Sequence, residues 1–316
     1  MKVPKNMGQN MAQALFQALL WPGLLGGWVW LLLYMVQQGY EPVTAFAIVV
    51  YGGNVVLFAL EYALPYSLKW RKIDNQFGND IAHTLAGNWV RSVVLSGVGL
   101  WFTLYVYTPQ LGAANFWTHL NWWPQFFAAL IVCDFGKYWY HRTIHERWGG
   151  WAFHALHHSA RRLWVGNAGR THFIDAAGFT FFGFVLLFAC RFSGEVIFWV
   201  AVTNVMVGAL SHCNIKMRLG VLNYIFNTPV LHRWHHSDVL SEGNRNYGQV
   251  LAFWDHIFGT YYNPGHPPNE VIGTRLEIPD NLIKQFYYPL VLLTQDAKKP
   301  WVYIGEKPTQ KQKEET

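Results

Sequence analysis

The 316-residue chain is 52% hydrophobic and 17% aromatic, whereas charged residues make up only 13%, about half their share in soluble globular proteins. Because its apolar residues also gather in long runs, this composition disfavours a soluble enzyme with an aromatic-rich core. The net charge of +6 does not indicate nucleic-acid binding, since no stripe of Lys and Arg is interleaved with aromatic residues. The three cysteines stand far apart and outside any CxxC pair, which argues against a disulfide framework or a thiolate zinc site.

Five apolar runs follow one another along the chain. They cover residues 11–36, 43–64, 85–107, 122–140 and 173–210. The first run is too long for the core of a signal peptide, so we expect a retained membrane span. The last run is interrupted near its middle by residues 191–194, which predicts a hairpin of two spans or a re-entrant pair. We therefore predict an all-α integral membrane protein with four to six transmembrane or re-entrant helices and a cytosolic helical cap.

The positions of Lys and Arg predict how these spans are oriented. Basic residues concentrate at the N-terminus, at 69–72, between 141 and 172, and after 211, and Arg191 is the clear exception. Arg91 interrupts the third run, where it either snorkels or faces the interior of the bundle. Because cytoplasmic loops carry an excess of basic residues, we expect both termini and the histidine-rich region on the cytoplasmic side. No ER retrieval signal stands at the C-terminus, which favours a bacterial inner membrane over the endoplasmic reticulum.

These patterns divide the chain into three regions. Residues 1–140 are predicted to form N-terminal transmembrane helices, and residues 141–297 a catalytic region that includes the membrane hairpin at 173–210. Residues 298–316 are rich in Lys, Gln and Glu, and we expect them to form a polar tail.

Eight of the 14 histidines fall into three short motifs. They are an HxxxH motif with His141 and His145, an HxxHH motif with His154, His157 and His158, and a second HxxHH motif with His232, His235 and His236. Residues three and four apart share one face of a helix, so each motif presents its imidazoles to a common region. Burying unpaired imidazoles is costly and charging them all is opposed by mutual repulsion, whereas metal binding removes both problems. Eight imidazoles suffice for two metal ions, and neutral imidazole suits iron, copper, zinc or nickel.

Two other functions also use clustered histidines. A zinc protease needs Glu directly after the first His of its motif as a general base, and position 142 is Arg. A metal transport or storage protein remains the alternative to an enzyme. Transport sites usually lie near the middle of the membrane, however, whereas these motifs follow the ends of predicted spans.

The motifs and their surroundings resemble the fatty acid hydroxylase/sterol desaturase superfamily of integral-membrane di-iron enzymes. The resemblance covers about residues 134–261, and its denser parts are the helix that ends in the first motif, Ser159, Asn167, Arg170-Thr171-His172, Thr228-Pro229, Asn246-Tyr247-Gly248 and residues 254–260. Phe173, Asp175 and Asn244 depart from the family pattern, in which Pro, Glu and an acidic residue are usual.

The resemblance implies an activity and a set of ligands. It adds His212 as a ninth metal ligand. It implies two iron ions that use O₂ to hydroxylate or desaturate a C–H bond of a lipid, such as a sterol, an acyl chain of an aminolipid or an alkyl ether lipid. Zinc, which has no redox chemistry, would occupy the same ligands as an inactive substitute. Since the sequence shows no reductase or cytochrome b5 motif, we expect electrons from a ferredoxin or from cytochrome b5 with its reductase.

Six further residues are expected to orient the ligands or to act as ligands. Asp134 and Tyr138 share one helical stripe with His141 and His145, at positions i, i+4, i+7 and i+11. They either hydrogen-bond to the ligands or form a polar contact between helices within the membrane. The other four residues are His83, His172, Asp255 and His256.

Overall fold

The computed structural model describes residues 7–107 and 116–294, so the predicted polar tail lies outside the described residues. The α-helices are α1 Met7–Gln37, α2 Pro42–Ala63, α3 Phe77–Phe102, α4 Trp122–Glu146, α5 Trp148–His158, α6 Phe173–Ala189, α7 Gly194–His212, α8 Pro229–His235, α9 Leu240–Gly243, α10 Phe253–Ile257 and α11 Leu282–Thr294. Within the described ranges β-pairing is limited to three isolated bridges. The predicted all-α fold is confirmed.

Four helices are long and apolar enough to cross a membrane. They are Met11–Gln37, Pro42–Ala63, Phe77–Tyr107 and Gly194–His212. The 22 residues of α2 rise about 33 Å, which matches the hydrocarbon core of a bilayer. The predicted run 122–140 does form a helix, but α4 is not among the four, because Asp134, Lys137 and many aromatic residues lower its hydropathy.

Helices α6 and α7 form the predicted hairpin. The chain reverses at Arg191, whose φ of 60° is a left-handed conformation suited to a tight turn. Ser193 then caps α7 by accepting a hydrogen bond from the Val196 N–H. The 17 residues of α6 rise only about 25 Å, which is short for a full span.

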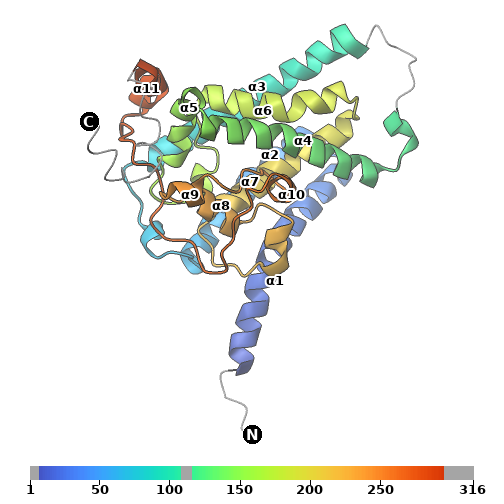
Figure 1. Cartoon of the computed structure of the whole chain (residues 1–316). Coiled ribbons are helices and arrows are strands. Elements are labelled where there is room, and N and C mark those ends of the chain that lie inside the picture. The colour runs from blue at the N-terminus through green and yellow to red at the C-terminus, as the bar shows by residue number, and fades with distance from the viewer. Residues whose placement is uncertain (1–6, 108–115, 295–316) are drawn as a thin grey trace.

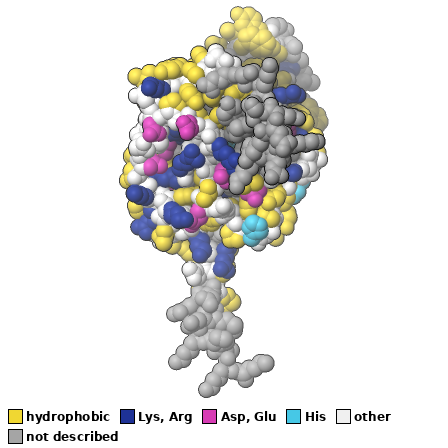
Figure 2. Space-filling view, turned by 60° about the vertical axis from the view of Figure 1, so that its left-hand side comes forward, with side chains coloured by type: hydrophobic (Ala, Val, Ile, Leu, Met, Phe, Trp, Pro, Cys, Tyr) yellow, Lys and Arg dark blue, Asp and Glu magenta, His cyan; other side chains and the backbone are white. Residues whose placement is uncertain are grey.

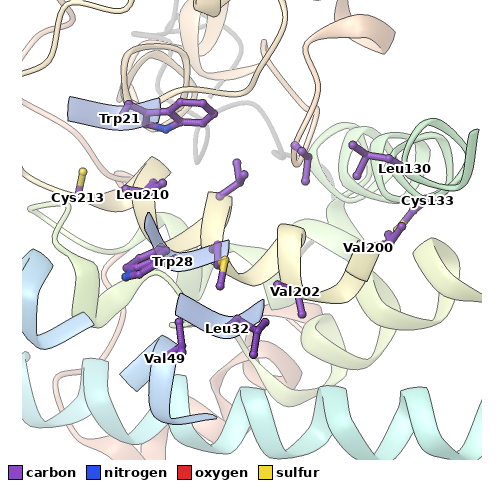
Figure 3. Packing of buried hydrophobic residues seen from close by; sticks show 14 of the residues in the cluster. Trp21, Trp28, Leu32, Val49, Leu130, Cys133, Val200, Val202, Leu210 and Cys213 are labelled. Atoms are coloured by element: carbon purple, nitrogen blue, oxygen red, sulfur yellow. The ribbon is translucent and has the colours of Figure 1, made fainter. Parts of the chain in front are cut away.

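The helices pack around α7 and α6. Figure 1 shows α3, α4 and α6 running side by side, with the start of α1 projecting from the rest, and both α1 and α2 contact α7. The main apolar core joins α1, α2, α4 and α7 (Figure 3), and its labelled members are Trp21, Trp28, Leu32, Val49, Leu130, Cys133, Val200, Val202, Leu210 and Cys213. More than half of the α7 span is buried, against 6% to 28% of the other three spans, so α7 is the central membrane helix.

The outer faces of the other spans are strongly apolar. Trp30, Val55 and Trp89 are each more than 60% exposed, although each stands well inside its helix. Side chains of this kind favour contact with lipid chains over contact with water. This arrangement supports the prediction of a membrane-embedded protein.

Buried carboxylates connect the spans to the loops that follow the histidine motifs. Glu61 of α2 accepts hydrogen bonds from the N–H groups of Val165 (2.8 Å) and Asn214 (2.9 Å). Asp80 of α3 forms an ion pair with Arg170 at 2.7 Å, and both side chains are almost fully buried. The spans therefore fix the backbone of the 159–172 loop.

We predict that Asp80→Ala lowers the free energy of unfolding by about 3–5 kcal/mol, because it leaves the Arg170 guanidinium buried without its counter-charge. Unfolding of the detergent-solubilised protein, followed by Trp fluorescence, measures the change. Glu270→Ala is the matched control, since it breaks the exposed pair with Lys69 and should cost less than about 1 kcal/mol. Equal effects of the two substitutions would contradict the role assigned to the buried pair.

Candidate metal centre

The nine predicted ligands converge in two groups. His141, His145, His154, His158 and His235 form the first group. His157, His212, His232 and His236 form the second. Within each group one ring nitrogen per residue lies within 4.8 Å of all the others, and every ring is buried. The structure thus brings together all three motifs and His212 at the end of the helix bundle.

The two HxxHH motifs each serve both groups. In α5, His154 and His158 belong to the first group and His157 to the second. In the motif at the end of α8, His232 and His236 belong to the second group and His235 to the first. Around a helix, residues i and i+4 lie 40° apart. Residue i+3 lies 60° from residue i and 100° from residue i+4. Helical periodicity therefore explains why each motif divides in this way.

The first two motifs meet because α4 and α5 are joined almost directly. Only Arg147 separates the two helices. A Cβ atom on Gly150 would lie 2.6 Å from the Cα of Ile144, so a glycine is needed for this close approach. The resulting corner brings the Nε2 atoms of His141 and His154 to 3.1 Å.

Hydrogen bonds on the outer side of the first group fix the ring orientation. His141 Nδ1 donates to the Tyr247 carbonyl (2.9 Å), His154 Nδ1 to the Asp175 carboxylate (2.8 Å), and His235 Nδ1 to the Arg245 carbonyl (2.8 Å). A neutral imidazole that carries its proton on Nδ1 has a lone pair on Nε2. These bonds therefore leave lone pairs facing the centre of the group.

The second group shows the same arrangement in part. His157 Nδ1 donates to the Arg170 carbonyl (3.1 Å), and His212 Nδ1 to the Asn167 side-chain oxygen (3.0 Å). The Nε2 atoms of His212 and His232 are 2.8 Å apart, and those of His232 and His236 are 3.1 Å apart. In the described part of the chain, Nδ1 of His232 and Nδ1 of His236 are buried without a hydrogen-bond partner.

The geometry fits a metal ion at each group. His141 and His154 face each other with two lone pairs at 3.1 Å and no proton to share. Nε2 of His145, of His158 and of His235 are buried and have no partner among the described residues, a costly state for polar atoms. Two nitrogen ligands about 2.1 Å from one ion and at right angles lie about 3.0 Å apart, close to the spacings observed. A cation in each group removes the repulsion and satisfies these nitrogens.

Five of the ligand imidazoles outside the membrane spans have lowered pKa values, which favours their neutral form. Burial lowers the pKa of His235 to about 3. Burial, together with the neighbouring imidazoles, holds the pKa values of His157, His158, His232 and His236 well below their ordinary value. Neutral rings are the form that binds metal ions.

Asp134 and Asp255 act on the site through the backbone of residues 247–251. Asp134 accepts hydrogen bonds from the Val250 and Leu251 N–H groups, and Asp255 from those of Tyr247 and Gly248. This segment supplies the carbonyl that holds His141. Neither carboxylate contacts a histidine of the two groups directly.

Tyr138 belongs to the same network. Its hydroxyl lies 2.9 Å from the Thr260 hydroxyl and accepts a hydrogen bond from Arg142 (3.2 Å). Thr260 in turn donates to Asp255 (2.7 Å). Tyr138 is therefore linked through Thr260 and Asp255 to the backbone segment that holds His141.

Three of the predicted histidines lie outside both groups. His83 Nε2 bonds to Gln285, and His256 Nε2 to the Tyr224 carbonyl. His172 bonds to the Phe286 carbonyl through Nε2, and its Nδ1 accepts from the Ile174 N–H at the start of α6. The ring nitrogens of His172 are thus engaged in fixing helix ends.

Sequence reasoning did not assign the partners of the ligand rings. Asp175 and Asn244 stood out only as departures from the family pattern, yet they hold His154 and His145. Asn167, which holds His212, was part of the resemblance without a role. The other partners are backbone carbonyls, for which no side-chain signal exists. The acidic residue at the start of an apolar helix was the one usable signal, since Asp175 lies within the first turn of α6.

The chain was compared with known families and proteins. The family model described as "Fatty acid hydroxylase" matches residues 126–260, a range that contains all nine histidines. The ornithine lipid hydroxylase OlsE of Rhizobium tropici is 39% identical over 82% of this chain and 78% of its own length. The alkylglycerol monooxygenase of Xenopus tropicalis is 28% identical over 73% of this chain and 50% of its own length, and that of Homo sapiens 31% over 45% and 34%. No solved structure matches.

These matches agree with the position and spacing of the histidine groups. The family range begins in α4 and ends after α10, so it includes every helix that carries a motif histidine. The chain belongs to the fatty acid hydroxylase superfamily and is an oxidoreductase.

Proposed function

We propose that this protein is a membrane-embedded, O₂-dependent di-iron enzyme that hydroxylates a C–H bond of a membrane lipid. The observation that carries the proposal is the pair of buried imidazole groups, whose lone pairs converge on two adjacent points. A di-metal site at the end of apolar spans suits the oxidation of a substrate that resides in the bilayer.

The two groups divide the ligands between the ions. His141, His145, His154, His158 and His235 would hold one iron, and His157, His212, His232 and His236 the other. Iron bound in these positions would supply the redox chemistry with O₂ that oxidation of an unactivated C–H bond requires. The ligand set contains no thiolate, and zinc in the same positions would be inactive.

The protein contributes positioning to this reaction. Asp175, Asn244, Asn167 and three backbone carbonyls hold the rings by Nδ1, which fixes the direction of each Nε2 lone pair and raises its basicity. The reaction R–H + O₂ + 2e⁻ + 2H⁺ → R–OH + H₂O takes two electrons from outside the chain. We propose a ferredoxin, or cytochrome b5 with its reductase, as the donor.

A lipid with a polar head group is the substrate that we favour. The relative from Rhizobium tropici, which is aligned over most of both chains, is named for hydroxylation of ornithine lipid, and the relatives from Xenopus tropicalis and Homo sapiens are named for alkylglycerols. Both names describe hydroxylation or monooxygenation, which favours hydroxylation over desaturation. An aminolipid therefore takes precedence over a sterol among the candidate substrates.

The histidine groups and both termini are proposed to face the cytoplasm of a bacterial inner membrane. Figure 2 shows a face of the molecule on which Lys and Arg side chains outnumber Asp and Glu. Exposed basic residues in the loops that adjoin the histidine-bearing helices include Lys69, Lys72, Arg161 and Lys216. An excess of basic residues marks cytoplasmic loops and attracts an acidic electron donor. The relative from Rhizobium tropici is bacterial.

We predict about two irons per chain in the purified protein, and lower iron content in His145→Ala and His157→Ala, each of which removes one ligand from one group. Elemental analysis measures the iron, and untargeted lipidomics of the expressing cells measures a lipid that gains 16 mass units. Both variants should lose that lipid.

His266→Ala is the control, because His266 is exposed and lies outside both groups. It should keep wild-type iron content and product. Labile zinc together with metal uptake into vesicles and no oxidised lipid would instead support a metal transporter.

We predict that Asp175→Asn reduces iron affinity or lipid hydroxylation about 10- to 100-fold, because the substitution removes the negative charge that makes His154 a stronger ligand. Asp175→Glu keeps a carboxylate there and should retain most of both. Iron retention during dialysis against a chelator and product yield are the measurements. Equal behaviour of the Asn and Glu variants would show that the charge of Asp175 has no such role.

A further inference from the structure

One cavity connects the two histidine groups to the interior of the helix bundle. It has a volume of about 140 Å³ and lies between α2, α3, α4, α6 and α7. His141 and His154 of the first group line it, as do His157, His212 and His232 of the second. A molecule in this cavity would therefore lie against both groups, where the proposed hydroxylation takes place.

Two cations line the same cavity without a counter-ion. Arg91 and Lys137 are its Lys and Arg residues, and no Asp or Glu belongs to its lining. Arg91 donates to Asn88 (3.1 Å) and Thr171 (3.0 Å), and Lys137 donates to Asn204 (2.7 Å), all neutral partners. No carboxylate of residues 7–107 and 116–294 forms an ion pair with either cation.

The nearby carboxylates are committed elsewhere. Asp134, one turn before Lys137, accepts from the N–H groups of Val250 and Leu251. Asp175 accepts from His154 and from Tyr140. Charged side chains within a membrane bundle are costly, and they usually pair with another charge or bind a ligand. The cavity therefore offers two positive charges to an incoming group.

The fold reserves space for the Lys137 side chain. A Cβ atom on Gly183 of α6 would lie 2.7 Å from the Lys137 Cε, so a larger residue there would force this side chain to shift. The ammonium lies 5.4 Å from the centre of the Phe184 ring, which gives it a favourable but uncharged neighbour.

The cavity also presents a buried acceptor that has no donor. The Asn227 side chain is 4% exposed, and its Nδ2 donates to the Gly248 carbonyl (2.6 Å). Its Oδ1 is buried without a partner in the described part of the chain. An unsatisfied acceptor of this kind costs about 1–3 kcal/mol unless a ligand or water donates to it. The cavity lining thus combines two cations with an acceptor to which an N–H or O–H group of a ligand can donate.

We propose that Arg91 and Lys137 bind a negatively charged group of the lipid substrate, a carboxylate or a phosphate, while Asn227 accepts a hydrogen bond from the same head group. This assignment rests on the proposed function for the identity of the substrate as a lipid. It makes the two cations determinants of substrate specificity, and it predicts that lipids with an anionic head group are preferred over neutral lipids of equal chain length.

The test compares matched lipid pairs on the iron-loaded protein in nanodiscs of neutral lipid. The carboxylate pair is N-palmitoyl-glycine and its methyl ester; the phosphate pair is 1-palmityl-glycerol-3-phosphate and 1-palmitylglycerol. Native mass spectrometry measures binding, and product analysis measures hydroxylation. We expect at least tenfold tighter binding of the anionic member in one pair, and the pair that shows it identifies the anion.

Arg91→Met and Lys137→Met should each reduce this preference about tenfold, whereas Arg91→Lys and Lys137→Arg should keep most of it. Lys284→Met is the control, since Lys284 is exposed on α11 and does not line the cavity. Iron content is measured for every variant. A purely structural role would lower the binding of both members of a pair equally.

Equal binding of both members in both pairs by the wild-type protein would overturn the inference, whatever the variants do. The proposed function fails separately, if the anionic lipid binds with the expected preference but no lipid acquires oxygen. Hydroxylation of neutral lipids alone would overturn the inference and leave the proposed function in place.

Discussion

The central feature of the candidate centre is an unfavourable contact between buried nitrogen lone pairs. His141 and His154 are fixed by acceptors on their outer nitrogens, and their inner nitrogens then meet at 3.1 Å with no proton between them. Nothing among residues 7–107 and 116–294 relieves this contact, so the fold is complementary to a cation between the two nitrogens. The surrounding loops are built to hold the rings in this otherwise unfavourable arrangement.

The loops obtain their rigidity from the membrane helices. Glu61 and Asp80 stand at the ends of α2 and α3 that adjoin the centre, and they bind the loop that carries Asn167 and Arg170. Those two residues in turn hold His212 and His157. On the other side, Asp134 in α4 fixes the segment whose Tyr247 carbonyl holds His141. The rings of His212, His157 and His141 are thus connected to α2, α3 or α4 through loop residues.

The sequence predicted which residues form the site better than it predicted their packing and hydrogen-bond partners. The apolar runs predicted the spans because hydropathy acts locally, and the spacing of the motifs predicted ligands because helical periodicity is regular. The position of His212 beside His232 depends on tertiary packing, and only the resemblance to a family pointed to it. Asp134 and Asp255 were expected to hydrogen-bond to the ligands, with a contact between helices as the alternative for Asp134, and both carboxylates bind backbone N–H groups. Lys137, which turned out to line the cavity, falls near the end of an apolar run and gave no distinct signal there.

The division of each HxxHH motif between the two groups has a mechanical consequence. His157 and His158 are adjacent in α5 but serve different groups, as do His235 and His236 at the end of α8. The separation of the two points therefore depends on the geometry of adjacent positions on α5 and at the end of α8. A change in spacing would require α5 and α8 to rotate together, against the corner with α4 and the packing of α7. Under the proposed function, two metal ions held by these groups would therefore stay at a nearly constant separation.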